Sequence, residues 1–387
     1  MLETGVLFRY GFDEARAGHW KARTFEREFA EWLGAEYCHL CSSGTSALNI
    51  AIAACGIGAG DEVIVPPFTF IATIEGVLQA GAVPVFADID ETLCLEPSSV
   101  RERITERTRA VVPVHMCGSM ARIDEIAALC SDRGLILIED TAQAVGATFR
   151  GKALGTFGDI GCFSFDPVKT ITCGEGGAIV TDDEELYQRS EQYADHGHDH
   201  VGTDRGAEGH PILGTNHRIS ELQAAVGLAQ LRKLDHILAV QRRNKSALRQ
   251  AFSGVPGITF RQIPDPDGDS ATFLSILAPD EETARAWMES LSAAGVPGCF
   301  YWYDNNWHYP RGWDHLRELR TSGRSPLTLL DPPPDLSRLD IEASDAVMSR
   351  TISILVKLSW SESELSGIQD RIVAALGGFS ATSSRVD

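Results

Sequence analysis

The sequence has little positive charge and lacks long apolar runs. Of its 387 residues, 34 are Lys or Arg and 54 are Asp or Glu, which gives a formal net charge of −20. A surface this acidic repels phosphate backbones and anionic headgroups, so we expect neither nucleic acid nor a membrane as a partner. No segment approaches the roughly 18 consecutive apolar residues of a membrane span. No basic segment followed by an apolar run opens the chain, so we expect no signal peptide and a cytoplasmic location.

Two common motifs are missing or incomplete. The dinucleotide fingerprint G-x-G-x-x-G follows no predicted strand, and Gly56, Gly58 and Gly60 come after a helix, which argues against a nicotinamide-dependent dehydrogenase. Cys38 and Cys41 form a CxxC pair, but the nine cysteines contain no second pair that would complete a metal site. In a chain without a signal peptide we expect these to be packed, reduced thiols.

What the sequence does contain is a regular alternation of short apolar runs with helical patterns. Runs rich in β-branched residues that end in turn residues alternate with amphipathic helices through the first half, which predicts an α/β fold with a mostly parallel sheet and helices on both faces. The predicted strands cover residues 38–42, 62–65, 83–87, 110–114 and 135–139, and then 161–165 and 178–181.

The second half predicts a smaller unit. Apolar residues keep a helical period over 219–252, which predicts one long helix bridging the two units. The Pro- and Gly-rich stretch 254–268 then indicates a boundary, and strand and helix patterns follow it, including an aromatic strand at 300–303. We therefore predict a large domain over 1–250 and a small C-terminal α/β domain over 251–387.

Ligands of such folds bind at the carboxyl ends of the parallel strands, so residues directly after a strand are candidates for a site. Ser42-Ser43-Gly44-Thr45-Ser46 follows the first strand and could hold a phosphate at a helix N-terminus, or could supply an ordinary helix cap. Asp140 ends a later strand, with Gln143 one helical turn on. A carboxylate there suits pairing with a pyridinium nitrogen, and a helix cap is the alternative.

Lys169 occupies an unusual loop between the last two core runs. The loop Ser164-Phe165-Asp166-Pro167-Val168-Lys169 is followed by Thr-Ile-Thr-Cys and the glycine-rich Gly174-Glu175-Gly176-Gly177. A lysine held against a sheet can form a Schiff base with a carbonyl compound, whereas most loop lysines are simply solvated.

Together these elements resemble the DegT/DnrJ/EryC1/StrS sugar aminotransferases. The resemblance rests on Ser-Phe-x-x-x-Lys-x-x-x-x-Gly-Glu-Gly-Gly with Asp140-x-x-Gln143, and on Gly60–Pro66, Thr69-Phe70 and Gly214–Arg218 in the same order. It extends from about residue 25 to the end of the small domain. It implies the aspartate aminotransferase-like fold type I, with pyridoxal 5′-phosphate (PLP) as cofactor.

The resemblance also implies roles for individual residues. Lys169 would hold the cofactor and move the proton, and Asp140 would pair with the ring nitrogen. Gln143 would contact the ring hydroxyl, and Phe70 would stack on the ring unless it is only a core aromatic. The phosphate would be bound by Gly44, Thr45 and Ser164, and by Asn216 of a neighbouring subunit, which implies a homodimer with shared active sites.

Segments such as Val114–Met120, Asn305–Tyr309 and Met348–Ser353 resemble one branch of the family. That branch makes 8-amino-3,8-dideoxy-octulosonate, a lipopolysaccharide sugar, and implies L-glutamate as donor and a keto sugar, 8-oxo-3,8-dideoxy-octulosonate, as acceptor. Because forked donors pair well with a sugar carboxylate, the basic candidates are Arg205, Arg218, Arg350 and Lys357, and His308 can donate to a hydroxyl.

Three alternatives stay open at this point. The acceptor could be an octose of antibiotic biosynthesis, the reaction could be a PLP-dependent dehydration or aromatisation on the same fold, or the chain could be a regulator. The histidines 196, 198, 200 and 210 alternate in part as on one strand face, as in some metal sites. We favour a substrate-contacting loop and expect no metal, because PLP chemistry needs none.

Overall fold

The structure is a computed structural model that describes residues 1–202 and 206–379, so Arg205 and the polar tail Ser380–Asp387 lie outside it. The central strands are β1 (Tyr37–Cys41), β2 (Glu62–Val65), β3 (Val83–Phe86), β4 (Thr108–Val111), β5 (Ile136–Asp140), β8 (Ile160–Ser164) and β9 (Gly177–Thr181). Within the described residues they form a seven-stranded sheet in the order β1-β9-β8-β5-β4-β2-β3. Strand β9 is antiparallel to both neighbours, and the other neighbouring pairs are parallel.

Helices cover both faces of this sheet, as predicted. Successive strand residues point to opposite faces, so in β5 Leu137 joins the core on one side and Ile138 the core on the other. One face is covered by α2 (Gly44–Ala54), α3 (Ala72–Gln79) and α6 (Glu184–Ala194). The other is covered by α1 (Lys21–Leu33), α4 (Pro97–Arg103), α5 (Ile123–Arg133) and α7 (Glu221–Leu231). A short hairpin, β6 (Thr148–Phe149) and β7 (Lys152–Ala153), follows β5.

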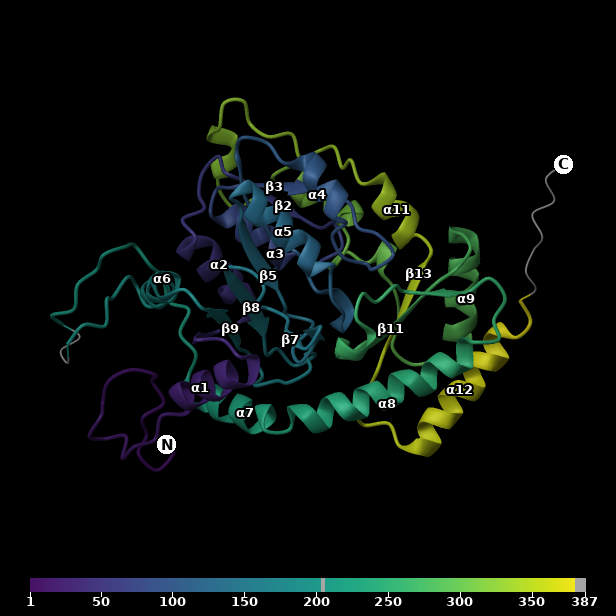
Figure 1. Ribbon diagram of the computed structural model, residues 1–387, viewed down its shortest axis with the longest axis horizontal. Helices are drawn as coiled ribbons and strands as arrows, with labels where there is room; N and C mark the ends of the chain where they lie inside the picture. The colour runs from purple at the N-terminus through teal and green to yellow at the C-terminus, as the bar shows by residue number, and fades with distance from the viewer. Residues whose placement is uncertain (203–205, 380–387) are drawn as a thin grey trace.

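Helix α8 (Leu234–Phe252) connects the two units along the bottom of Figure 1. Its first turns bury Leu234 and Ile237 in the core of the large unit, and its last turns bury Leu248 and Phe252 in the core of the small unit. The prediction of one helix over 219–252 is wrong, because α7 ends at Leu231 before α8 begins. The break lets α7 pack against α1 while α8 runs on to the small unit.

The small unit is built on an antiparallel sheet. Among the described residues its order is β10-β11-β13-β12, from β10 (Thr259–Phe260), β11 (Phe273–Leu277), β12 (Cys299–Tyr301) and β13 (Thr351–Leu355). Helices α8, α9 (Glu281–Ala293) and α12 (Glu362–Leu376) cover it. The aromatic strand predicted to reach residue 303 ends at Tyr301, because the chain turns there and buries Trp302 in the core of the large unit.

The chain between residues 302 and 348 returns to the large unit. Tyr309 and Ile341 pack into the core on one face of the large sheet, and Trp313 and Leu316 pack into the core on the other. This stretch includes the short helices α10 (Asp314–Arg317) and α11 (Glu342–Met348). The domain boundary after residue 250 therefore stays a prediction. Residues after it pack into the cores of both the small and the large unit.

Two smaller expectations concern cysteines and membranes. Cys38 and Cys41 are buried unpaired thiols, which confirms that they are packing residues, and burial raises the pKa of Cys41 to about 12. Across residues 1–202 and 206–379, no helix combines the length and the apolar character needed to cross a membrane.

Candidate active site

A cavity of about 190 Å³ lies where β1, β5 and β8 end, between the large unit and the returning segment that carries His308. Because the carboxyl ends of parallel strands meet at one edge of a sheet, residues far apart in the chain meet here. The lining includes most of the predicted cofactor residues and one predicted substrate residue, namely Gly44, Thr45, Phe70, Asp140, Gln143, Ser164, Lys169 and His308.

Asp140 is the buried carboxylate at the end of β5. Its Oδ2 accepts a hydrogen bond from the hydroxyl of Thr73 (2.7 Å), and its Oδ1 accepts one from the Ala142 N–H (3.1 Å). Burial raises the pKa of Asp140, and these hydrogen bonds and the nearby Lys169 ammonium oppose the rise. A carboxylate held this way can pair with a cationic ring nitrogen.

Sequence reasoning missed Thr73, which orients Asp140. Its hydroxyl also lies 2.7 Å from the hydroxyl of Thr69, which precedes α3 by three residues, and both threonines line the cavity. The available signal was the position of these threonines shortly after the parallel strand β2, where residues of a site are expected.

The N-terminus of α2 and the end of β8 form a cradle for an anion. Ser43 caps α2 by accepting a hydrogen bond from the Ser46 N–H (3.0 Å), so the N–H groups of Gly44 and Thr45 lie in the first turn. A Cβ on Gly44 would lie 2.7 Å from Cβ of Ser164 and 3.0 Å from its hydroxyl oxygen. Only glycine leaves this space open, which fits a phosphate bound by backbone N–H groups and the Ser164 hydroxyl.

Gln143 is oriented by a tight turn beside it. Its amide oxygen accepts a hydrogen bond from the Cys117 N–H (3.0 Å). That bond leaves the amide nitrogen as the group that can donate to a ring hydroxyl, the role the resemblance implies.

Lys169 lies in the loop between β8 and β9, half-buried at the edge of the cavity. The loop is shaped by Asp166, whose carbonyl accepts from the Lys169 N–H (3.1 Å) and whose side chain accepts from the Val168 N–H (2.9 Å). The lysine therefore shares one cavity with Asp140, Gln143 and the phosphate cradle, as a lysine that binds an aldehyde cofactor must.

Phe70 is an aromatic side chain in the lining of the cavity. The ring of Phe70 stacks on Trp307 with centroids 5.7 Å apart and planes at 7°. Backbone hydrogen bonds fix this contact, because the Thr69 N–H donates to the carbonyl of His308 and the Ile71 N–H to that of Trp307, both at 3.1 Å. Phe70 also lines the cavity, so a planar cofactor ring can lie against it.

His308 is the predicted substrate residue that lies in this cavity. Its Nδ1 is 3.1 Å from the side-chain oxygen of Asn305, and its ring lies 4.7 Å from the ring of Trp302. Burial, and then the Lys169 charge, lower the pKa of His308 to about 4. A neutral imidazole can both donate to and accept from a sugar hydroxyl.

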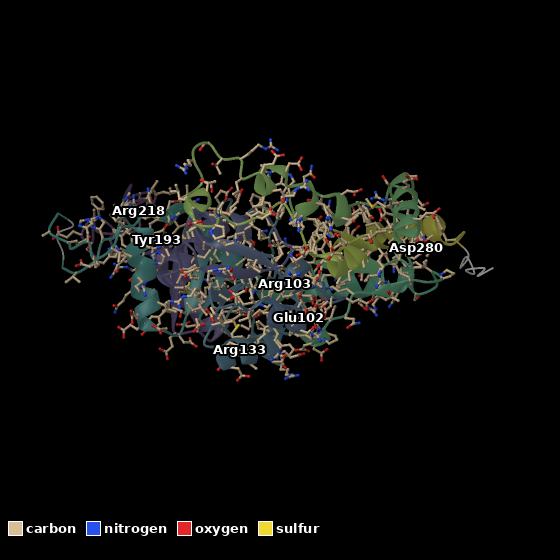
Figure 2. The ribbon with its side chains drawn as sticks, turned by 90° about the horizontal axis from the view of Figure 1, so that it is seen from above. Glu102, Arg103, Arg133, Tyr193, Arg218 and Asp280 are labelled. Atoms are coloured by element: carbon tan, nitrogen blue, oxygen red, sulfur yellow. The ribbon has the colours of Figure 1, made fainter. Side chains whose placement is uncertain are left out.

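Four predicted residues lie away from the cavity. Asn216 is exposed, and Arg218 forms an ion pair with Asp195. Figure 2 shows Arg218 beside Tyr193 at the end of the molecule opposite Asp280 of the small unit. Arg350 pairs with Glu91 (2.5 Å) in a separate acidic hollow, and Lys357 is exposed. Their substrate and phosphate roles stay predictions, because within one subunit none of these side chains lines the cavity.

The histidine loop does not have the strand geometry that its alternation suggested. His196 and His200 have φ of 59° and 54°, in the left-handed region, so the segment turns instead of extending. His198 pairs with Glu208 (3.0 Å), and His200 stacks on Tyr10 with centroids 4.5 Å apart. In the described part of the chain, no group of three His, Cys, Asp or Glu side chains is arranged to hold a metal ion.

Known proteins resemble this chain over most of its length. The model of the DegT/DnrJ/EryC1/StrS aminotransferase family matches residues 15–324. The spore coat polysaccharide biosynthesis protein SpsC of Bacillus subtilis (strain 168) is 38% identical over 281 residues, which cover 71% of this chain and 72% of SpsC. L-glutamine:2-deoxy-scyllo-inosose aminotransferase of Streptomyces lividus is 43% identical over 233 residues, which cover 58% of this chain and little more than half (55%) of that relative.

Solved structures agree with the predicted fold class. 3-Amino-5-hydroxybenzoic acid (AHBA) synthase superposes with a TM-score of 0.79 at 31% identity, covering 97% of this chain and 94% of that structure. The mostly parallel sheet, the second unit and this similarity confirm the fold of PLP-dependent aminotransferases. With this fold, with Lys169, Asp140 and Gln143 around one cavity, and with the family match, the chain belongs to the DegT/DnrJ/EryC1/StrS aminotransferase family, whose cofactor is PLP.

Proposed function

We propose that this protein is an aminotransferase that moves an amino group from L-glutamate to a keto sugar. The observation that carries the proposal is the single cavity that unites Lys169, Asp140 and Gln143 with the glycine-dependent cradle at Gly44. A lone lysine, carboxylate or helix N-terminus has ordinary structural uses, whereas their meeting at one sheet edge matches the separate needs of PLP.

Each residue then has a defined task. When bound, PLP supplies an electron sink for the carbon that carries the amino group. The carboxylate of Asp140 holds the proton on the ring nitrogen, supported by the Thr73 hydroxyl. The amine of Lys169 removes and returns the proton at the substrate carbon, from its position at the cavity edge. The Phe70 ring lines the site and offers an apolar face to the cofactor ring.

For the acceptor, the proposal extends to 8-oxo-3,8-dideoxy-octulosonate, with the 8-amino sugar as product. It is supported by His308, which lies in the cavity and belongs to the segment Asn305–Tyr309 that resembles the octulosonate branch. The Streptomyces lividus relative is named for another acceptor, 2-deoxy-scyllo-inosose, and for L-glutamine as donor. The experiments below therefore compare different amino donors and different acceptors.

We also propose a homodimer with shared active sites. Asn216 is exposed, and the neighbouring His217 carbonyl accepts from the Ser42 N–H (2.8 Å), just before the phosphate cradle begins. Residues 217 and 218 are held to the end of β1 and the start of α2 of the same chain, through a bridge between Cys41 and Arg218 and a contact of His217 Nδ1 with the Ser46 hydroxyl (3.0 Å). The exposed Asn216 side chain beside them is where a second copy could contact this chain.

The first experiment follows the visible absorption of the protein with PLP, before and after addition of L-glutamate or L-glutamine. We expect a band that bleaches with one donor, and no such band in Lys169→Ala. Lys233→Ala, which removes an exposed lysine in the break between α7 and α8, serves as the control and should behave as wild type. A protein without the band, or a Lys169→Ala variant that still bleaches normally, would contradict the proposal.

A second candidate function is PLP-dependent aromatisation or dehydration on the same fold, which the similarity to AHBA synthase favours. A panel of acceptors separates the two. Amine formation on the octulosonate with matching loss of donor supports the aminotransferase, whereas release of water without loss of donor supports the alternative. Amine formation only on other sugars would reject the octulosonate and keep the aminotransferase.

A further inference from the structure

The turn Met116–Gly118 lies between the cavity and the small unit. Met116 lines the cavity, while the carbonyl of Gly118 accepts hydrogen bonds from the N–H and the hydroxyl of Ser270 (3.0 and 2.8 Å). A Cβ on Gly118 would lie 2.1 Å from the Thr272 hydroxyl oxygen, so the two units touch here with no room for a side chain. The turn is thus held from both sides.

On the small-unit side, Arg261 donates a hydrogen bond to the turn. This arginine follows β10, is 6% exposed, and uses all three of its nitrogens. They donate to the carbonyl of Met116 (2.6 Å), to the carbonyl of Thr92 (2.7 Å) and to Sγ of Cys94 (3.3 Å). A buried guanidinium with all three nitrogens hydrogen-bonded is a rigid anchor, because moving it would leave several polar groups without partners.

On the cavity side, the same turn holds Gln143. Cys117 has φ 56° and ψ 33°, a left-handed backbone conformation that residues other than Gly, Asn and Asp rarely adopt. This conformation aims its N–H at the amide oxygen of Gln143 (3.0 Å). A strained residue persists only where its surroundings impose it, and here the contacts of Arg261 and Ser270 on either side of Cys117 do so.

We propose that Arg261 is a positioning residue for Gln143, acting across the boundary between the units through the Met116–Gly118 turn. This proposal rests on the role of Gln143 in the proposed function. Arg261 does not line the cavity. It fixes the strained Cys117 N–H, which holds the Gln143 amide oxygen and leaves the amide nitrogen free to donate to the ring hydroxyl. The small unit thereby sets the geometry of a cofactor contact that lies in the large unit.

The test is a double-mutant cycle on the dissociation constant of PLP, followed by the visible band of the full-length protein. Arg261→Met and Gln143→Leu should each weaken PLP binding by roughly fivefold, the worth of one hydrogen bond. Since both remove the same contact, the double variant should bind like Gln143→Leu alone. Arg261→Lys, which keeps one donor, should restore part of the loss.

Two further variants keep the result decisive if Arg261→Met folds poorly. Ser270→Ala removes one donor to the same turn and should give a smaller loss that also disappears in the Gln143→Leu background. Gln262→Ala breaks a contact to Glu91 across the same boundary without touching the turn, and should leave PLP binding unchanged.

The outcomes separate the two proposals. If Gln143→Leu leaves PLP binding unchanged, the role of Gln143 in the proposed function fails. If Gln143→Leu weakens binding but the Arg261 and Ser270 losses persist undiminished in that background, Arg261 acts only on general stability, and the positioning role is overturned while the proposed function stands.

Discussion

At the scale of single residues, the environment and not the residue type sets the chemistry of the site. Burial disfavours the charged form of Asp140 and raises its pKa, and the hydrogen bonds from Thr73 and Ala142 oppose that rise. Burial beside Phe70 and Trp302 also disfavours the charged form of His308, and because that form is a cation its pKa is lowered. The two side chains face one cavity with different electrostatic roles.

His308 yields a prediction about acid stability. Its pKa is about 4 in the folded chain against 6.5 as the ordinary value, so the unfolded chain binds more protons between these values. Stability is then lost as the pH falls through 6.5 toward 4. In cofactor-free protein, His308→Gln should reduce the loss between pH 7 and pH 5 by about 1–2 kcal/mol.

Urea unfolding at the two pH values measures this difference. His236→Gln, which replaces an exposed histidine on α8, is the matched control and should leave the loss unchanged. Equal losses for wild type and His308→Gln would show that His308 is not held neutral in the folded chain.

At the scale of elements, close packing between helices explains where glycine is required. In α7, a Cβ on Gly227 would lie 2.4 Å from Cε1 of Phe25 in α1. In α12, a Cβ on Gly367 would meet nothing nearer than Nη1 of Arg371 at 3.8 Å. Both glycines occupy helix interiors, where alanine is normally the better residue.

The two glycines should therefore respond oppositely to alanine. Gly367→Ala should stabilise the protein by about 0.5–1 kcal/mol, because it lowers the entropy of the unfolded chain. Gly227→Ala should destabilise it by about 1–3 kcal/mol, because the methyl group overpacks the contact with Phe25. Urea midpoints measure both, and a Gly227→Ala variant as stable as Gly367→Ala would mean that α1 and α7 do not pack this closely.

At the scale of the whole molecule, the site of one chain brings the cofactor residues together without Asn216. The exposed Asn216 and the ion-paired Arg218 lie on the segment that follows the histidine loop. In a homodimer with shared sites these residues would have a binding role, because a second copy could bring them to the phosphate cradle at Gly44.

Mixed dimers test this arrangement. Lys169→Ala should be inactive, and Asn216→Asp should bind PLP weakly because it sets a second negative charge beside the phosphate. When subunits of the two variants are mixed and allowed to exchange, activity should return, since each mixed dimer has one site with both residues intact. Mixtures that stay as weak as the separate variants would indicate sites built within one chain.

The amino-acid sequence by itself determined the mostly parallel α/β character, the helices on both faces and most of the candidate cofactor residues that line the cavity. Strand and helix periods are local, and Gly44 at a helix start, Asp140 at a strand end and Lys169 in a loop each have positions that the neighbouring residues set. Only the tertiary structure decided the break between α7 and α8, the return of residues 302–348 to the large unit, and the partners Thr73 and Arg261. Those features depend on contacts between residues distant in the chain, where burial and packing outweigh local preference.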